Sequence, residues 1–432
     1  MAIRAEPRTE WDELVDLERR TVSPRVFTDP DVYRAEQEHI FARCWLYVAH
    51  ETQMPRPGDF VTTYMGEEPV IVCRDADGRV RVFVNSCRHR GMRICRTDAG
   101  NVRTFQCPYH GWTYDVQGRL VGVPQYQEAY HGELKREEWG LLEVPRVDAY
   151  RGLIFASFDK EVESLDTYLA EMQWYLDVVL NRTAAGWVVL PGVHKWSLKG
   201  NWKLAAEQFG GDNYHVTAGH ESMARLGLVP PGTTSGDEPW VRDFEVRTDK
   251  GHGWINLAIP DPPAITEITG AYQAQVQAEA RQRLSAAQSD LVGCVYVGTI
   301  FPNFSLISFV GFLSFRLWQP RGPKRMEVWS WSLVERDAPP AVVELARKMQ
   351  ILTFSPSGIF EQDDGEMWGE SVEAMGGVYR SRFPLNYQMG AGHGRRDPEK
   401  PGLIHPPSTE ISVFGFYERW RALMSDGTGV HA

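Results

Sequence analysis

Two short pairs of a cysteine and a histidine are the residues whose types and spacing most directly indicate chemistry. The first pair is Cys87-Arg-His89 and the second is Cys107-Pro-Tyr-His110, with seventeen residues between them. Zinc fingers start from two cysteines separated by about two to four residues, and neither pair has that composition. One cysteine and one histidine per loop instead suits a [2Fe–2S] cluster in which one iron binds both thiolates and the other binds both imidazoles.

The residues around the two pairs favour this interpretation over a structural zinc site or a chance grouping of buried thiols. Gly91 and Gly111 follow the pairs, and glycine lets backbone amides approach the sulfur atoms of a cluster and donate hydrogen bonds to them. The other cysteines lie outside the pattern, and we expect them to be packed thiols: Cys44, Cys73, Cys95 and Cys294.

A second group of possible metal ligands lies in the segment 201–220. Asp212, His215 and His220 follow one another closely there. If the segment is helical through His215, Asp212 and His215 share a face, and His220 follows after a bend. Two neutral imidazoles and one carboxylate form the facial triad of non-haem Fe(II) oxygenases, which leaves positions open for O₂. Asp212 could be that carboxylate, or it could accept the ring N–H of a ligating histidine.

A run of acids in the segment 354–371 offers another carboxylate ligand. Glu361, Asp363, Asp364 and Glu366 crowd together where a helix is expected to start. Acids at a helix start also complement the helix dipole on a solvated face, and taken alone that simpler explanation is favoured. The two histidines in need of a carboxylate, together with the cluster motif upstream, reverse the balance.

Composition and charge exclude several classes of protein. The chain has 432 residues, of which 43% are hydrophobic and 12% aromatic, so it can build large cores and is not a disordered protein. The net charge of −11 disfavours nucleic-acid binding, which needs clustered lysine and arginine. The charged N-terminal segment has no apolar stretch typical of a signal peptide, and the apolar run 305–315 is too short to span a bilayer. We therefore expect a cytoplasmic protein that contacts no membrane.

The periodicity of the chain predicts an α+β fold, with a small all-β domain inserted into a larger domain that has an antiparallel sheet flanked by helices. We expect the boundaries at 1–45 for N-terminal helices of the larger domain, 46–157 for the all-β domain and 158–432 for the rest. Helices are expected at 8–22, 31–48, 164–180, 201–225, 263–288, 339–372 and 409–425, and a second β-rich block at 292–335.

The order of these motifs resembles the large (alpha) subunit of Rieske non-haem iron aromatic ring-hydroxylating dioxygenases. The two Cys/His pairs are followed by E-x4-D-x2-H-x4-H from Glu207 and then by F-E-Q-D-D-G-E-x-W from Phe360. The resemblance runs from about residue 24 to the expected C-terminal helix. It implies a Rieske [2Fe–2S] cluster on Cys87, His89, Cys107 and His110, an Fe(II) ion on His215, His220 and Asp364, and a bridging, catalytic role for Asp212.

The resemblance also implies an activity and partners. Such an oxygenase uses O₂ and electrons from a ferredoxin and/or a reductase to cis-dihydroxylate an aromatic ring in hydrocarbon catabolism. The chain has no strand–G-x-G-x-x-G–helix segment of its own for a nucleotide, so electrons must come from another protein. In the family the cluster of one subunit lies beside the iron of its neighbour in a trimer, α₃ or α₃β₃ with a small beta subunit. Asp212 would then join His215 to His110 of the partner subunit.

The motif positions also indicate a substrate pocket. Gln208 lies near the metal, where the family often has asparagine. The other candidates are apolar and favour an uncharged ring, bicyclic or larger, over a benzoate-like acid that would need an arginine: Phe209, Val216, Met223, Val295, Val297, Phe354 and Phe360. Any one of them could instead fill the core.

Two rival functions remain open at this stage. A Rieske-type aromatic monooxygenase or demethylase would share both metal motifs. An electron-transfer Rieske protein would need neither His215, His220 nor Asp364, and would hold two irons per chain where the oxygenase holds three.

Overall fold

The computed structural model describes residues 10–226, 242–309 and 312–426. The chain forms two compact units. One is Phe41–Leu165, and the other combines the chain up to Ile40 with the chain from Asp166. A smaller unit is thus inserted into a larger one; it begins at Phe41 and ends at Leu165, where the sequence led us to expect 46 and 157. We call them the inserted unit and the large unit.

The inserted unit is built from three small antiparallel sheets with strand orders β6-β5-β4-β7, β10-β9-β8 and β11-β12-β3. Asp75–Gly78, with a left-handed glycine at φ 83°, makes a tight turn of the kind that an Asp-Gly sequence favours. The strands are β3 Leu46–His50, β4 Asp59–Met65, β5 Glu68–Arg74, β6 Val80–Val84, β7 Ala99–Asn101, β8 Thr104–Gln106, β9 Thr113–Asp115, β10 Leu120–Gly122, β11 Arg146–Tyr150 and β12 Leu153–Ser157.

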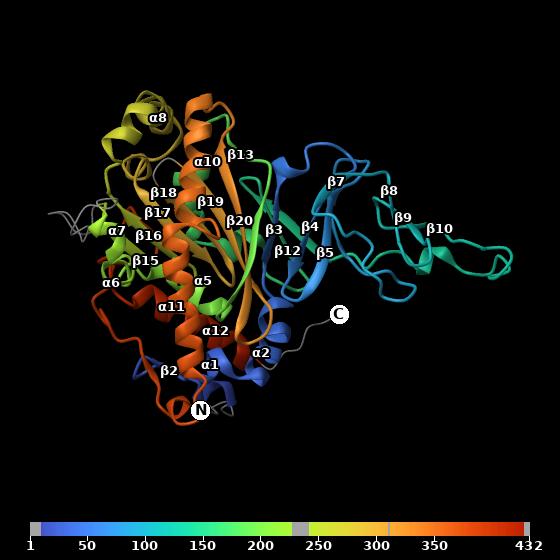
Figure 1. Ribbon diagram of the computed structural model, residues 1–432, viewed down its shortest axis with the longest axis horizontal. Coiled ribbons are helices and arrows are strands. Elements are labelled where there is room, and N and C mark those ends of the chain that lie inside the picture. Colours follow the sequence, from blue (N-terminus) through green and yellow to red (C-terminus); the bar gives the residue numbers. More distant parts are fainter. Residues whose placement is uncertain (1–9, 227–241, 310–311, 427–432) are drawn as a thin grey trace, which may run out of the picture. The chain divides into compact units, whose positions relative to one another are not determined.

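The large unit contains one long antiparallel sheet in the order β13-β20-β19-β18-β17-β16-β15-β23-β22, with β14 also paired to β20 (Figure 1). Alternating side chains of its central strands face opposite sides, and both sides are buried. The strands are β13 Trp187–Val189, β14 His194–Lys199, β15 Phe244–Arg247, β16 Gly253–Leu257, β17 Val295–Ile300, β18 Phe304–Phe309, β19 Phe312–Pro320, β20 Arg325–Glu335, β22 Arg395–Arg396 and β23 Leu403–His405.

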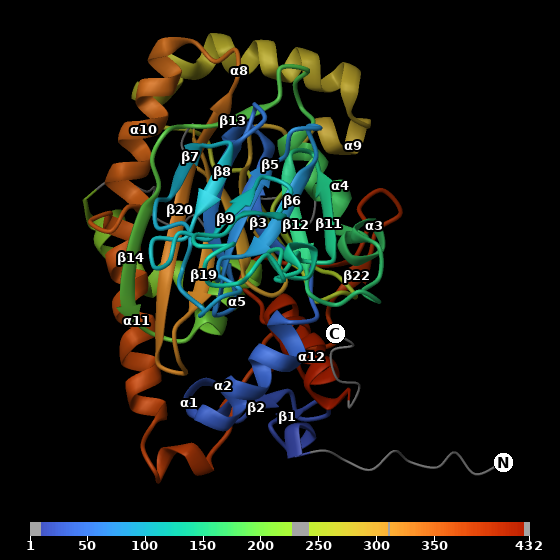
Figure 2. The ribbon, with the colours of Figure 1, turned by 90° about the vertical axis from the view of Figure 1, so that its right-hand side faces the viewer.

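Helices cover this sheet. α5 packs against β16 to β19 and against α12, α10 packs against β19 and β20, and α11 follows α10 along β14. α8 lies beyond one end of the strands (Figures 1 and 2). The helices are α1 Arg25–Thr28, α2 Pro30–Glu36, α3 Leu165–Leu169, α4 Met172–Leu180, α5 Trp202–Gly211, α6 Val216–Gly219, α7 Glu221–Arg225, α8 Pro263–Arg283, α9 Ala286–Ser289, α10 Pro340–Phe354, α11 Ile359–Met375 and α12 Ile411–Ser425.

The carboxylate of Glu36 ties three distant helices together. It accepts hydrogen bonds from Nζ of Lys203 at 2.5 Å and from the indole nitrogens of Trp202 and Trp420 at 3.0 and 2.8 Å. Glu36 and Lys203 are fully buried, and a charge pair that is bonded this completely is strongly destabilised when one partner is removed. The start of α5 is thereby fixed against α2 and α12.

The helix expected at 8–22 is wrong. The described part of that segment holds a 3₁₀ turn at Glu10–Glu13 and two short paired strands, β1 Val15–Asp16 and β2 Thr21–Val22. β2 also pairs with β21 Leu385–Asn386, a partner more than 360 residues away that local periodicity could not reveal. The expected helix 31–48 likewise ends early, in a π-helical turn at Gln37–Phe41, because β3 begins at Leu46 and pairs with β12.

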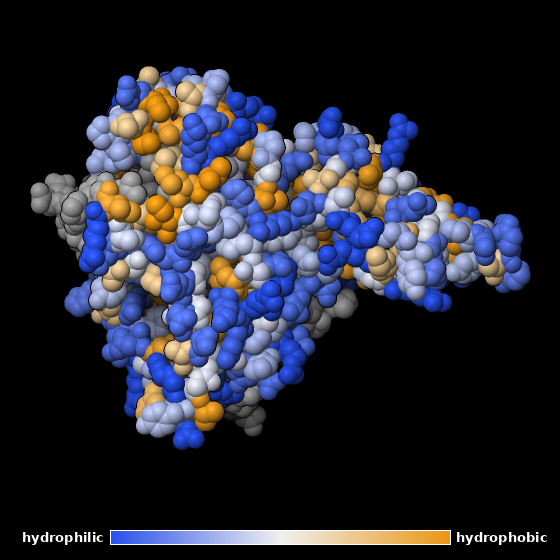
Figure 3. Space-filling model, viewed as in Figure 1, coloured by the Kyte–Doolittle hydropathy of each residue, from blue (hydrophilic) through white to orange (hydrophobic). Residues whose placement is uncertain are grey.

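Hydrophobic side chains also reach the surface of the large unit. Figure 3 shows them gathered over α8 and α10, where Ile268, Ile351 and Leu352 are exposed. Patches of this kind are typical of protein contact surfaces. Across the described ranges, no helix combines the length and apolar character that a membrane span requires.

Candidate active site and metal centres

The end of helix α5 presents the first part of a metal site. The helix starts at an Asn201 cap and runs to Gly211, with Asp212 as its C-terminal cap. A side chain at Gly211 would collide with Ser412 of α12, so glycine is needed for the two helices to pack this closely. Unlike the expected helix, α5 does not continue through His215, because the backbone of Asp212 leaves the helical conformation at φ −113° and ψ 80°.

His215 is oriented by Asp212. Nδ1 of His215 lies 2.6 Å from the main-chain carbonyl of Asp212, and Oδ2 of Asp212 is 3.5 Å from the same nitrogen. Because a carbonyl oxygen can only accept, Nδ1 carries the proton and the lone pair of Nε2 is free for a metal. The main-chain N–H of His215 donates to Oδ1 of Asp212 at 3.1 Å. The expected helical face is thus replaced by a turn, and the shortest contact of the ring is to main chain.

Burial and the hydrogen bonds from His215 shift the pKa of Asp212 in opposite directions. Burial alone would raise the pKa of this carboxyl, but hydrogen bonds from the ring of His215 and from the main-chain amides of Tyr214 and His215 outweigh it and hold the pKa below its ordinary value. Asp212 is therefore an anion in the folded protein. An anion beside Nδ1 strengthens the donor character of the opposite nitrogen toward a metal.

His220 is oriented in the same way by a different acid. Its Nδ1 lies 3.2 Å from Oδ2 of Asp363, and a carboxylate accepts, so the lone pair of Nε2 is again free. That Nε2 atom lies 3.3 Å from Oδ1 of Asp364, the next residue of α11. Adjacent helical residues point about 100° apart. Asp363 therefore reaches the outer nitrogen of the ring while Asp364 reaches the inner one.

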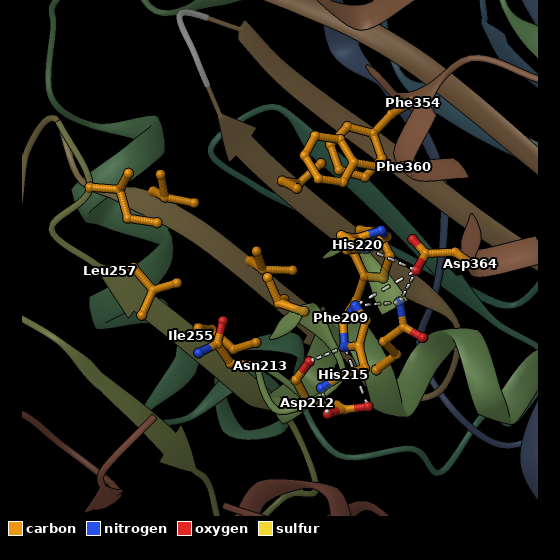
Figure 4. Close-up of a pocket in the computed structure, with 16 residues that line it drawn as sticks. Phe209, Asp212, Asn213, His215, His220, Ile255, Leu257, Phe354, Phe360 and Asp364 are labelled. Atoms are coloured by element: carbon orange, nitrogen blue, oxygen red, sulfur yellow. Dashed lines mark hydrogen bonds and ion pairs between the residues drawn. The ribbon is translucent and has the colours of Figure 1, made fainter. Parts of the chain in front are cut away.

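Three donor atoms converge in this way. The ligating atoms of His215, His220 and Asp364 lie within 4.8 Å of one another, and all three side chains point to one spot (Figure 4). Within the described part of the chain, this is the one group of three or more His, Cys, Asp or Glu side chains whose ligating atoms come this close together. Two neutral imidazoles and one buried carboxylate are the donor set of an iron facial triad, so the residues fit the expected ion.

Gln208 sits against this convergence point. Its Nε2 donates to Oδ1 of Asp364 at 2.8 Å and lies 3.3 Å from Nε2 of His215. The indole N–H of Trp368 donates to Oε1 of Gln208 at 2.7 Å. Because an indole nitrogen only donates, this contact fixes which end of the amide faces the ligands. Trp368 therefore positions Gln208. It is the last residue of the F-E-Q-D-D-G-E-x-W motif, but residue spacing alone gave no reason to assign it a role.

An apolar cavity of about 110 Å³ opens beside the three donors. Its lining includes seven of the eight pocket residues expected from the sequence, whereas Met223 is buried without lining it. Figure 4 shows Phe354 and Phe360 stacked at one side and Ile255 and Leu257 at the other. The expected members that line the cavity are Gln208, Phe209, Val216, Val295, Val297, Phe354 and Phe360.

The motif positions missed five lining residues: Asn213, Ile255, Leu257, Ile259 and Ile307. Strand pairing accounts for three of them, whereas Asn213 lies in the turn after α5 and Ile259 follows the end of β16. Ile255 of β16 and Ile307 of β18 both pair with Val297 of β17, and Leu257 pairs with Val295. Residues opposite one another in a sheet share a face, so the two expected valines bring their neighbours into the pocket. The alternation in Ile255-Asn-Leu257 was a usable signal, but the register was not visible in the sequence.

The two Cys/His pairs lie on matching loops of the inserted unit. The amide of Gly91 donates to the carbonyl of Cys87 at 2.8 Å, and Gly111 donates to Cys107 at 3.0 Å. Both glycines are left-handed, at φ 72° and 74°. A side chain at these turns would be strained, so glycine is needed to form both loops.

The donor atoms of these loops fit a cluster with two kinds of iron. Nδ1 of His89 is buried and has no hydrogen-bond partner among the described residues, which is unusual for a polar atom. The rings of His89 and His110 lie 4.6 Å apart, and Trp112 stacks on His89. Burial and the neighbouring His110 lower the pKa of His89, which keeps the ring in the neutral form that binds metal.

Tyr114 adds a contact to one of the thiols. Its hydroxyl lies 3.3 Å from Sγ of Cys87 and accepts from the amide of Arg88 at 3.2 Å. A metal-bound thiolate has no proton, so in the cluster-loaded protein the hydroxyl must be the donor. Hydrogen bonds to cluster sulfurs raise the reduction potential by stabilising the extra negative charge of the reduced state.

Comparison with known families assigns both units. Residues 44–145 match the Rieske [2Fe-2S] domain family, and residues 165–426 match the family of the ring hydroxylating alpha subunit (catalytic domain).

Individual proteins of that kind are similar over nearly the whole chain. Biphenyl 2,3-dioxygenase subunit alpha of Rhodococcus jostii is 42% identical over 421 residues, covering 96% of this chain and 91% of the relative. N,N-dimethyl phenylurea N-demethylase subunit alpha of a Sphingobium strain is 35% identical over 446 residues, covering 96% and 95%. A crystal structure of naphthalene 1,2-dioxygenase from Rhodococcus sp. bound to indole has a TM-score of 0.84 at 39% identity, covering 94% and 95%.

We predict that Tyr114→Phe lowers the reduction potential of the cluster by about 60 mV, which is tenfold in equilibrium for one electron. The reason is the loss of the hydrogen bond to Cys87 without loss of a ligand. Spectroelectrochemical titration measures the potential. Tyr126→Phe, whose hydroxyl donates to main-chain carbonyls elsewhere in the inserted unit, is the matched control. An unchanged potential in Tyr114→Phe would contradict the contact.

We predict a graded response to alanine along α11. Asp364→Ala should lose the mononuclear iron and keep the cluster, because it removes the carboxylate that faces both Nε2 atoms. Asp363→Ala should weaken iron binding by about 10- to 100-fold, since it only releases the His220 ring. The exposed Glu366→Ala is the control and should keep all iron. Metal analysis with the visible spectrum of the cluster measures both centres, and equal losses in the first two variants would refute the assignment.

Proposed function

The chain belongs to the family of ring-hydroxylating dioxygenase alpha subunits, and from this premise we propose that it is a terminal oxygenase that adds both atoms of O₂ to an uncharged aromatic ring as a cis-diol. The family is one of oxidoreductases that carry a Rieske [2Fe–2S] cluster and a mononuclear iron. The observation that carries the proposal is the convergence of two imidazole nitrogens and one carboxylate at the wall of an apolar cavity.

The proposed ligands are Cys87, His89, Cys107 and His110 for the cluster, and His215, His220 and Asp364 for the iron. When bound, the iron would supply a reducing centre with positions open to O₂. The protein's own part is to hold the donors. Asp212 and Asp363 fix the rings of the two histidines, and Gln208 fixes the carboxylate of Asp364.

Forming a cis-diol from a ring and O₂ consumes electrons and protons in equal number. Electrons reach the site one at a time, and a Rieske cluster is a one-electron store. The chain has no nucleotide fingerprint of its own, which supports a ferredoxin and/or a reductase as the source. The apolar walls of the cavity offer water few hydrogen-bond partners, which disfavours side reactions with water.

We propose that Asp212 carries the link between subunits, accepting from His215 on one side and from His110 of the partner subunit on the other. Asp212 is anionic and a third of its side chain is exposed, so its carboxylate can accept a further hydrogen bond. Exposed aromatic residues next to His215 and next to His110 support a subunit interface at both places. Tyr214, next to His215, is 61% exposed, and Tyr109, next to His110, is 59% exposed. Large exposed tyrosines are typical of surfaces that another protein covers.

The assembly we propose is a homotrimer of alpha subunits, with or without a small beta subunit (α₃β₃ or α₃). The relatives are themselves called alpha subunits. The apolar patch over α8 and α10 (Figure 3) is a surface of the sort that an assembled subunit covers.

The substrate class follows from the lining. The cavity walls are dominated by Phe, Ile, Leu and Val side chains, and the ionisable groups that face the cavity are the proposed metal-site residues. An uncharged ring held by packing suits these walls. A relative named for biphenyl and a solved relative with indole bound support a bicyclic substrate.

A second candidate is oxidative N-demethylation or another monooxygenation. The relative named as an N-demethylase subunit supports it, because its sequence aligns over the same share of this chain. Both reactions would use the same metal residues, so the product distinguishes them.

Product analysis under ¹⁸O₂ tests the function. The purified protein, loaded with both centres and supplied with a ferredoxin and reductase, is offered biphenyl, naphthalene and N,N-dimethyl phenylurea. We expect cis-dihydrodiols of the arenes with both oxygen atoms labelled. A singly labelled phenol or a demethylated urea as the main product would replace dioxygenation by the second candidate.

We predict that Asp212→Asn keeps the cluster and most of the iron but lowers steady-state turnover by about 100-fold or more. The amide keeps the size of the side chain, removes its charge and turns one acceptor into a donor. Dithionite should reduce the cluster normally, because the defect lies in transfer between subunits. Asp249→Asn, at an exposed site, is the control. Loss of the iron in Asp212→Asn would instead make Asp212 a ligand.

A further inference from the structure

Two phenylalanines form one wall of the cavity, and they belong to the elbow between α10 and α11. Phe354 is the last residue of α10 and Phe360 is the second residue of α11. Their rings stack at 5.2 Å with an interplanar angle of 12° (Figure 4). Phe360 also meets the ring of His220 edge-on at 4.7 Å. The position of this elbow therefore sets both the width of the cavity and a contact to one proposed ligand.

Arg316 of β19 holds the elbow from behind. Nη1 donates to Oε2 of Glu361 at 2.5 Å, and Nη2 donates to the main-chain carbonyl of Phe354 at 2.6 Å. One rigid guanidinium thus bonds the end of α10 and the first turn of α11. The side chains of Arg316 and Glu361 are 0% and 1% exposed, so water does not compete for these contacts.

The same guanidinium lies directly behind the cavity wall. It is 5.0 Å from the ring centre of Phe354 and 5.3 Å from that of Phe209, and both rings line the cavity. Trp318 lies 5.5 Å away on another side. A buried positive charge at this distance acts strongly on the cavity unless an anion cancels it, because the surroundings have a low dielectric constant. Glu361 is that anion.

We propose that the Arg316–Glu361 pair determines specificity by holding the Phe354–Phe360 wall in place and by cancelling the positive charge behind it, so that the cavity accepts uncharged aromatic rings and rejects aromatic carboxylates. The inference rests on the proposed function and names its substrate class. Neither residue touches the substrate; Arg316 and Glu361 are positioning residues that act through the wall and through the field in the cavity.

Two variants separate the role of holding the wall from the role of cancelling the charge. Glu361→Gln keeps the length of the side chain and an oxygen that can accept from Arg316, but it leaves the guanidinium without a counter-charge. The double variant Arg316→Met with Glu361→Met removes both charges and both hydrogen bonds, and apolar replacements of a buried ion pair are often well tolerated. The other ionisable groups at the cavity, namely Asp212, His215, His220 and Asp364, stay the same in both.

The test is equilibrium binding of indole and indole-3-carboxylate, which differ by one carboxylate. Binding is measured by calorimetry on the oxidised, metal-loaded protein without an electron donor. Burial raises the pKa of Glu361 to about 7, so the measurement is made at pH 8.5, where its carboxylate is ionised. The visible spectrum of the cluster and the iron content verify that each variant is folded and loaded.

We expect Glu361→Gln to bind indole-3-carboxylate at least tenfold more tightly than the unaltered protein, with indole binding changed by less than about threefold. The double variant should bind the carboxylate no better than the unaltered protein, and should bind indole more weakly because the wall is no longer held. If the folded Glu361→Gln protein does not gain carboxylate binding, or if the double variant gains it equally, the charge role is wrong. Unchanged indole binding in the double variant would overturn the positioning role.

Failure of this inference is distinguishable from failure of the proposed function. Binding needs no turnover, so a protein that yields no diol can still show the expected preference for indole. A protein that forms diols normally but shows no effect of Glu361→Gln would refute the specificity role alone.

Discussion

The hydrogen bond from Gln208 to Asp364 is the contact on which the rest of the site depends. It spans 2.8 Å between α5 and α11 and joins residues 156 positions apart in the chain. Asp364 is 1% exposed, and a buried carboxylate needs donors or a cation to be stable there. Gln208 supplies a donor before any metal binds, and Nε2 of His215 and Nε2 of His220 lie 3.6 and 3.3 Å from the same oxygen. The amide is in turn held by Trp368, so the two helices are linked in both directions.

Contacts within the large unit hold α5 and α11 at this distance. α5 is fixed at its start by the Glu36 carboxylate and along its length by Thr299 of β17, whose hydroxyl donates to the carbonyl of Ala206 at 2.7 Å. α11 is fixed at its start by Arg316 of β19. Both anchors come from central strands of the same sheet, β17 and β19, which flank β18. Strands β16, β17 and β18 of that sheet also supply apolar residues to the cavity. One rigid sheet therefore sets the metal site, its substrate wall and the electrostatic field between them.

Much of this could be predicted from the sequence, because the chemistry is concentrated in short motifs. Each Cys/His pair, the two histidines His215 and His220, and the adjacent acids Asp363 and Asp364 form short local groups, and their residue types restrict the metal. Local patterns could not predict the contacts between residues that are far apart in the sequence. The sequence placed Asp212 and His215 on one helical face, whereas α5 ends at Gly211, where it packs closely against α12, and the chain turns at Asp212. Ile255, Leu257 and Ile307 enter the pocket because of the strand register, which the sequence does not reveal. Glu361 has the sequence pattern of a solvated acid, but in the structure it is buried and paired with Arg316.

The most direct test of the central claim is a crystal structure of the metal-loaded protein with anomalous diffraction recorded at the iron edge. The account predicts a single iron peak bounded by Nε2 of His215, Nε2 of His220 and the carboxylate of Asp364. It also predicts a close pair of peaks in the inserted unit, one beside Cys87 and Cys107 and the other beside His89 and His110. An iron held by the carboxylate of Asp212 in place of Asp364, or fully loaded protein with no peak between the two histidines, would contradict it.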